Sequence, residues 1–139
     1  MLTQLIYSSR ATRNLNGHDI SLIVSSSQRN NALRDLTGAL CFVNDTFVQC
    51  FEGERSAVNL LYKHLLQDTR HKELEILSFD EIAERRFATW AMGFFSHKNK
   101  FSQLYLKHSR MAEFAPFSMT AFDVNKFFDE VALYVTVPE

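Results

Sequence analysis

A phenol and a carboxamide stand out in stretches of sequence that are otherwise apolar. Gln49 lies in NDTFVQCFEGE, and strand alternation places it on the same side as Phe47 and Phe51. Tyr7 lies in the strand-like stretch LTQLIYSS. A buried amide without partners costs a few kcal/mol, so Gln49 is expected to meet a polar group. An amide both donates and accepts hydrogen bonds, and a phenol carries a transferable proton, so the pair could serve a polar ligand.

Alternating strand and helix signals predict the elements that position these two residues. The helices are expected from His18, with Asn16 as N-cap, to the QRNN stretch, and around the apolar stripe Val58–Leu65. The dipeptide Asn44-Asp45 predicts a tight hairpin between two strands. The five strands are expected at Leu2–Ser9, Leu36–Val43, Thr46–Gly53, Leu74–Phe79 and Thr89–Phe95.

This order predicts an α+β fold, a ferredoxin-like five-stranded mixed sheet with two helices on one face, because right-handed crossovers place both helices together. A C-terminal two-helix extension should follow and cover the bare sheet face or a partner. Its helices are expected near Phe101–His108 and along an apolar stripe after the N-cap Thr120. The stripe consists of Val124, Phe127, Phe128 and Val131. We expect residues 1–97 to be the functional domain and 98–139 an extension within the same unit.

Polar residues near the ends of the first two helices could complete a ligand site. They are Asn30, Asn31, His64, Arg70 and His71. The asparagines should close the first helix, and the other three lie late in, or just after, the second. If the two helices run parallel, these residues would surround a slot whose floor is Tyr7 and Gln49. A flat heterocycle with carbonyls and ring nitrogens would suit such a slot.

The composition excludes several other classes of protein. Fifteen basic and sixteen acidic residues give a net charge of -1, and no dense basic run is present to track nucleic acid. No apolar run approaches the length of a membrane span, and the first residues lack a signal peptide, so a cytoplasmic protein is expected. Cys41 and Cys50 lack metal-ligand spacing and are expected to be buried and reduced, with no metal site.

Several separated motifs, in order, resemble the BLUF family of blue-light sensors that bind FAD. They are LIYSSR, SSQRNNALRDLTGALCF, FVQCFEGE, QDTRH and RRFATWAMGF. The likeness covers roughly the first hundred residues, and the tail is similar to the two-helix C-terminus of short, cyanobacterial PixD-like members. The resemblance implies a photosensory signalling protein and not an enzyme. FAD is the implied cofactor, and FMN and riboflavin remain alternatives.

The resemblance implies roles for individual residues. Tyr7 would donate an electron and a proton to the excited flavin, and Gln49, between Tyr7 and the flavin, would rearrange its hydrogen bonds. The further flavin contacts implied are Asn30, Asn31, Arg70 and His71. His64 stands where PixD-like proteins carry an arginine, so flavin affinity could depend on pH.

A route for the signal is also expected, because the predicted fifth strand leads directly into the tail. Trp90 and Met92, spaced i, i+2 on this strand and therefore on one face, match the family's tryptophan and methionine and would relay the change at Gln49 to the tail helices. Which of them packs beside Gln49 is left open. The 139 residues leave no room for a cyclase, phosphodiesterase or DNA-binding domain, so the output is expected to be a contact with a separate effector protein. The resemblance to PixD-like proteins implies that this chain binds a response-regulator-like partner and forms a homo-oligomer.

Two other functions are kept as alternatives. The chain could be an interaction module that uses its Phe-rich last helix, with Gln49 merely structural. It could also be an acylphosphatase-like enzyme that holds an anion near Arg10 and Asn44, although it lacks a glycine-rich phosphate loop. Singly, each candidate residue also has an ordinary structural explanation. The shared order of the motifs favours the sensor, and colour separates the three, because only the sensor should purify yellow.

Overall fold

A five-stranded mixed sheet is the centre of the computed structural model, which describes residues 1–88, 90–95, 99–109 and 114–136. Its strands are β1 (Leu2–Ala11), β2 (Thr37–Val43), β3 (Thr46–Glu54), β4 (His71–Glu81) and β5 (Gly93–Phe95). They lie in the order β4-β1-β3-β2-β5, antiparallel except for the parallel pair β2 and β5. The predicted ferredoxin-like mixed sheet is therefore confirmed, and β1 and β3 are interior strands.

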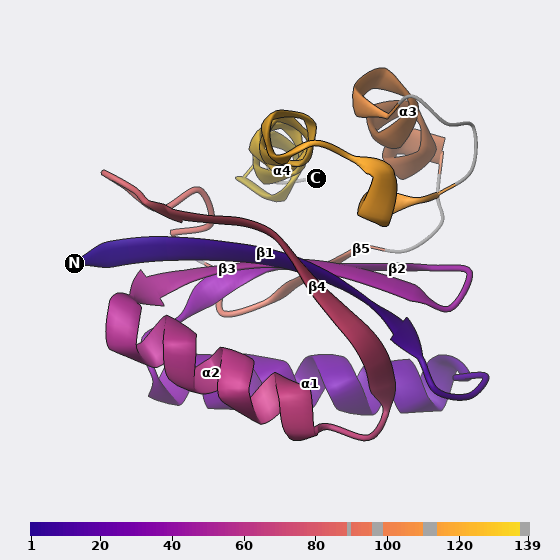
Figure 1. Ribbon diagram of the computed structural model, residues 1–139, viewed down its shortest axis with the longest axis horizontal. Coiled ribbons are helices and arrows are strands. Elements are labelled where there is room, and N and C mark those ends of the chain that lie inside the picture. The colour runs from indigo at the N-terminus through magenta and orange to yellow at the C-terminus, as the bar shows by residue number, and fades with distance from the viewer. Residues whose placement is uncertain (89, 96–98, 110–113, 137–139) are drawn as a thin grey trace.

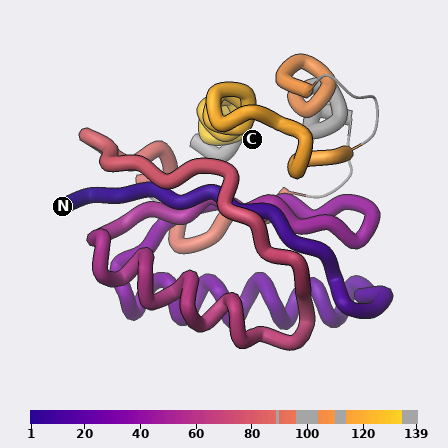
Figure 2. Tube along the Cα trace, in the orientation of Figure 1, coloured from indigo at the N-terminus to yellow at the C-terminus, as the bar shows by residue number. Residues whose placement is uncertain are grey.

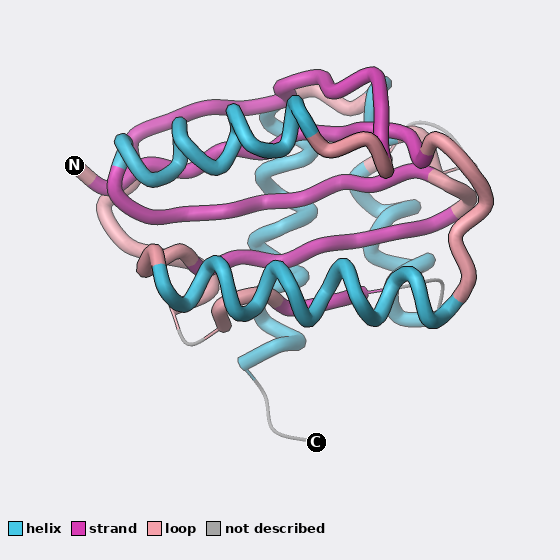
Figure 3. The backbone as a smooth tube through the Cα atoms, turned by 90° about the horizontal axis from the view of Figure 1, so that it is seen from below, coloured by secondary structure: helices cyan, strands magenta, loops and turns pink. Residues whose placement is uncertain are grey.

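Two helices, α1 (Gly17–Leu33) and α2 (Arg55–Gln67), cover one face of the sheet and run along its strands (Figures 1 and 3). The predicted N-cap of α1 is present as a capping box. The Asn16 side chain accepts from the Asp19 N–H at 2.9 Å, and the Asp19 carboxylate accepts from the Asn16 N–H at 3.0 Å. The local sequence thus determines the residue at which α1 begins.

The opposite face of the sheet is covered by α3 (Asn99–His108), a short 3₁₀ helix η1 (Pro116–Ser118) and α4 (Ala121–Thr136) (Figure 1). These helices follow β5 in the chain, as the trace in Figure 2 shows. The Thr120 hydroxyl accepts from the Asp123 N–H at 3.0 Å, which confirms the predicted N-cap of α4. The boundary expected between residues 97 and 98 lies outside the described residues.

Strand alternation gives the sheet a separate apolar core on each face. Leu5, Tyr7 and Phe51 belong to the α1 and α2 side, whereas Ile6 and Cys50 belong to the α3 and α4 side. Four side chains predicted for the α4 stripe are buried in the second core; they are Val124, Phe127, Phe128 and Val131. Both cysteines are buried free thiols, as predicted.

Two predicted boundaries are wrong. Helix α1 continues to Leu33, so Asn30 and Asn31 lie inside its last turns and do not close it. The fifth strand begins only at Gly93, because the Trp90 N–H bonds to the Phe87 carbonyl at 3.1 Å and turns the chain beforehand. Trp90 and Met92 therefore precede the strand, where the period-two rule does not apply. Thr89, the predicted first residue of this strand, lies outside the described residues.

The helices of the described ranges are all too short or too polar to cross a lipid bilayer. Within the same ranges, no three His, Cys, Asp or Glu side chains gather as a metal site would require.

Candidate functional site

Tyr7 and Gln49 face each other across the pair formed by β1 and β3. They occupy the same position in the antiparallel register, and both are buried, with 2% and 4% of their surfaces exposed. The Tyr7 hydroxyl donates a hydrogen bond to the Gln49 Oε1 at 2.5 Å. Adjacent strands and a shared face thus bring together the two residues that the sequence singled out.

The amide nitrogen of Gln49 points toward a sulfur atom. Its Nε2 donates to the Met92 Sδ at 3.5 Å. A thioether is a weak acceptor, and a carboxamide nitrogen carries two N–H groups. Gln49 therefore keeps donor capacity that a stronger acceptor in the neighbouring pocket could use.

Met92 and Trp90 lie on opposite faces of the sheet, which corrects the prediction that they share one face. Met92 is 2% exposed and packs with Leu40 and Phe47 on the α1 side. Trp90 packs against the core under α3 and α4. In this structure it is therefore Met92 that contacts Gln49.

Burial keeps the Tyr7 phenol protonated. The removal of the ring from water raises the pKa of Tyr7 far above its ordinary value, and the nearby Asp68 and Tyr62 raise it further. A neutral phenol can give up a proton only to a partner that accepts it directly. The Gln49 Oε1 is in that position.

An open pocket lies above this pair, between α1 and the end of α2. Its empty volume, including the part continuous with solvent, is about 400 Å³. Its lining consists of Tyr7, Ile23, Ser27, Leu40, Phe47, Gln49, Leu65, Asp68, Arg70 and His71. The walls are mainly apolar, and polar groups gather on the floor and at the end of α2.

Arg70 and His71, two of the predicted site residues, meet the pocket at the end of α2. The Arg70 Nη2 pairs with the Asp68 Oδ2 at 2.7 Å. The His71 Nε2 lies 2.7 Å from the Leu65 carbonyl, which can only accept, so we assign the proton to Nε2. In the neutral ring, Nδ1 then accepts from the Ser9 hydroxyl at 2.8 Å. His71 is thus fixed by the protein itself at the edge of the pocket.

Asn30, Asn31 and His64 are not among the described residues that line the pocket. Asn30 and His64 are exposed. Asn31 is buried, and its Nδ2 donates to the Ala91 carbonyl at 2.9 Å. This bond holds the segment before β5 against α1.

Sequence reasoning did not assign several lining residues to the site. Leu40 and Phe47 share the Gln49 face of the sheet by strand alternation, so their positions could have been inferred. Ile23 and Ser27, four residues apart, lie on one face of α1. Asp68 follows α2 and gives no sequence signal, because its position depends on where that helix ends.

The fold and this pocket define a small α+β domain with a candidate ligand site between α1 and the end of α2. Residues 2–93 match the family described as BLUF, sensors of blue-light using FAD. The chain belongs to the BLUF family.

Relatives and solved structures support this assignment. The chain is 39% identical over 92 residues to the photoactivated adenylate cyclase subunit beta of Euglena longa, covering 66% of this chain and 11% of that protein. It is 36% identical over 95 residues to the blue light- and temperature-regulated antirepressor BluF of Escherichia coli K12, covering 68% and 24%. The chain thus spans only a small part of these curated relatives.

Two solved structures share the fold over 96% of both chains. The BLUF protein BlrB in its dark state superposes with a TM-score of 0.81 at 30% identity. The photo-activated state of BlsA gives a TM-score of 0.87 at 24% identity, a likeness of fold alone.

Proposed function

We propose that this protein is a blue-light photoreceptor that binds FAD non-covalently in the pocket between α1 and α2. The observation that carries the proposal is the hydrogen bond from the Tyr7 hydroxyl to the Gln49 Oε1 on the pocket floor. A flavin supplies absorption of blue light and an excited state that takes up an electron.

The pocket suits a flat ring system with polar edges. Apolar walls from both helices and the sheet would contact the ring faces, and the N–H groups of Gln49 would meet its carbonyl or ring nitrogens. Arg70 would place a cation beside the pyrimidine edge or the phosphates, and His71 would border the same edge. The proposed flavin contacts of Asn30, Asn31 and His64 require the flavin to extend beyond the residues that line the pocket in this structure. Asn31 uses one of its two N–H groups at Ala91 and keeps the other for the flavin.

Tyr7 and Gln49 would carry the photochemistry. With a flavin bound, Tyr7 would give up one electron under light, and its phenolic proton would move along the existing hydrogen bond to the Gln49 Oε1. After the electron and proton had returned to Tyr7, the Gln49 amide would be left with different hydrogen-bond partners. A changed hydrogen-bond pattern at the flavin would shift its absorption to the red. The loss or gain of the contact between Gln49 and Met92 would change how the segment before β5 is held.

The output we propose is a light-dependent contact with a separate effector protein. The likeness to PixD-like proteins supports a response-regulator-like partner, a homo-oligomer and a cytoplasmic location. We also propose residues 1–97 as the sensor and 98–139 as its helical extension, with Trp90 and Met92 as relay residues.

The acylphosphatase-like alternative gains no support from its candidate residues. The Arg10 Nε pairs with the Glu73 Oε2 at 3.0 Å, and the guanidinium lies over the Phe117 ring. Asn44 is at the β2–β3 turn with a positive φ of 51°.

An absorption spectrum tests the proposed function. The purified chain is incubated separately with FAD, FMN and riboflavin, and spectra are recorded in the dark, after blue light and during dark recovery. We expect bound FAD, a red shift on illumination and a return in the dark. A chain that stays colourless with all three flavins, or that binds one without any shift, contradicts the proposal.

A further inference from the structure

Side chains of β3 hold both ends of the segment that leads into β5. The Glu52 carboxylate, which is fully buried, accepts from the backbone N–H of Arg86 at 3.0 Å and of Phe87 at 2.8 Å. At the other end, the Gln49 Nε2 donates to the Met92 Sδ at 3.5 Å. Because Gln49 and Glu52 belong to one strand, any movement of Met92 relative to Gln49 acts on a segment fixed at Arg86.

The segment comprises the described residues 86–88 and 90–92, and its middle is held through backbone carbonyls. The Gly38 N–H donates to the Trp90 carbonyl at 3.0 Å, and the Asn31 Nδ2 donates to the Ala91 carbonyl at 2.9 Å. These anchors, which act beside the apolar packing of Phe87, Trp90 and Met92, are directional polar contacts. Such contacts weaken steeply when their distance or angle changes, so a small shift can exchange one arrangement for another.

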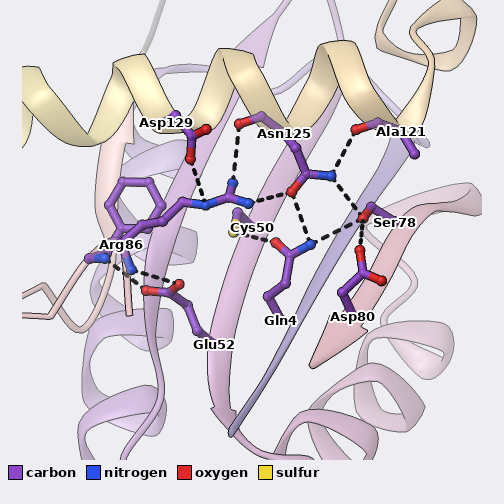
Figure 4. Close-up of polar contacts among 10 residues, drawn as sticks. Gln4, Cys50, Glu52, Ser78, Asp80, Arg86, Ala121, Asn125 and Asp129 are labelled. Carbon is purple, nitrogen blue, oxygen red and sulfur yellow. Dashed lines mark hydrogen bonds and ion pairs between the residues drawn. The ribbon is translucent and has the colours of Figure 1, made fainter. Parts of the chain in front are cut away.

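The Arg86 side chain continues from this segment to helix α4 (Figure 4). Its Nε pairs with the Asp129 Oδ1 at 3.1 Å, and its Nη1 donates to the Asn125 backbone carbonyl at 3.4 Å. Its Nη2 also donates to the Asn125 Oδ1. The guanidinium is mostly buried, with 17% of the side chain exposed. One residue thus joins the segment before β5 to two successive turns of α4.

Asn125 connects the same contact to the sheet (Figure 4). Its Oδ1 also accepts from the Gln4 Nε2 at 3.1 Å, and its Nδ2 donates to the Ser78 Oγ at 2.9 Å. Gln4 belongs to β1 and Ser78 to β4. Helix α4 is therefore docked by a polar cluster as well as by its apolar stripe. We call Gln4, Ser78, Arg86, Asn125 and Asp129 the α4 cluster.

We propose that Arg86 is the positioning residue through which a change at Gln49 and Met92 alters the docking of α4. The inference rests on the proposed function, since light must first change the Gln49 hydrogen bonds. When Met92 loses or gains its contact with Gln49, the segment shifts against its anchor at Glu52. The guanidinium of Arg86 then leaves its positions at Asn125 and Asp129, and α4 loosens from the sheet.

Arg85, the neighbouring residue, provides a matched control. Its side chain is equally buried, at 17% exposed, but it reaches β2, the turn before it and the Glu52 backbone carbonyl of β3. Its Nη1 donates to the Thr37 Oγ1 at 3.0 Å, and its Nη2 donates to the Asp35 carbonyl at 2.9 Å. Arg85→Gln therefore removes the same charge and similar hydrogen bonds without touching the α4 cluster.

Hydrogen exchange of the flavin-loaded full chain, in darkness and under blue light, tests the proposal. In the native protein, light should speed the exchange of the α4 amides. In Arg86→Gln these amides should exchange about tenfold faster already in the dark, the change expected from loss of one charge-assisted contact. Light should add no further change, while the red shift of the flavin persists. Arg85→Gln should keep the native light response in α4.

Each other outcome is decisive. A native light response of α4 in Arg86→Gln overturns the proposal, as does an α4 that shows no light response in the native protein despite a normal red shift. Absence of the red shift in the native protein instead contradicts the proposed function. If Arg86→Gln fails to fold, Asp129→Asn replaces it, because that side chain is 50% exposed and its loss removes only the ion pair. If the double variant Asp129→Asn and Asn125→Ala keeps the native light-dependent exchange of the α4 amides, the proposal is overturned.

Discussion

The Tyr7 hydroxyl donates directly to the Gln49 Oε1, at 2.5 Å, between residues that face each other on two interior strands. Interior strands are paired on both sides, so the two backbone positions have little freedom to separate. The hydrogen bond between phenol and amide is therefore built into the rigid part of the fold.

Tyr7→Phe should still bind flavin but show no red shift, because it removes the transferable proton and the oxidisable phenol. We also expect a loss of about 1 to 3 kcal/mol in the free energy of unfolding, since the Gln49 oxygen loses its donor. Difference absorption spectra and urea unfolding check the two effects. Tyr62→Phe is the control, as its ring lies 6.4 Å from that of Tyr7 on the same side of the sheet. A normal shift in Tyr7→Phe would remove Tyr7 from the mechanism.

Gln49→Leu should likewise bind flavin and form no normal red-shifted state. The leucine fills similar space but offers the Tyr7 hydroxyl no acceptor and the flavin no N–H. Flavin fluorescence gives the retained affinity, and the light-minus-dark spectrum gives the response. Gln67→Leu, on the exposed end of α2, is the control and should behave as the native protein. Photoactivity of Gln49→Leu equal to native would refute the role of the amide.

Met92→Ala should keep the red shift and weaken the light-dependent output. A buried methionine truncated to alanine typically costs about 2 to 5 kcal/mol of stability. Met92→Leu conserves volume and should cost less than about 1.5 kcal/mol, but it also removes the sulfur that accepts from Gln49. We therefore expect both variants to lose light-driven hydrogen exchange in α4. If the leucine variant retains it, the sulfur contact is not part of the relay.

Because Tyr7 is buried, the free energy of unfolding should depend on pH in the alkaline range. Its folded pKa lies above the unfolded value near 10, so its contribution is fully present below pH 10. Above pH 10 the unfolded chain releases this proton and the folded chain does not, so stability falls by about 1.4 kcal/mol per pH unit from this residue. Urea unfolding from pH 9 upward should give a shallower fall for Tyr7→Phe. Identical slopes would show that Tyr7 ionises equally in both states.

Much of the fold follows from local sequence. Strand alternation places Tyr7 and Gln49 on one face, and the Asn44-Asp45 turn is a hairpin in which both residues have positive φ. Asn16 and Thr120 cap their helices as predicted. These features depend on neighbours in the chain, which is why a single sequence contains them.

Other features depend on contacts that sequence does not contain. The turn at Phe87 and Trp90 ends the period-two pattern and sends Trp90 and Met92 to opposite faces. The stretch DEIAERR is highly charged, a composition typical of exposed turns, yet the Arg85 and Arg86 side chains are largely buried. Their partners on β2 and α4 are distant in the chain, so no local pattern indicates them.

Along β1 and β3, successive side chains point to opposite faces, so neighbours such as Gln49 and Cys50 serve different sides of the sheet. Substitutions on one side can accumulate without touching the groups opposite. Evolution can therefore refit the face under α3 and α4 while inheriting the pocket intact.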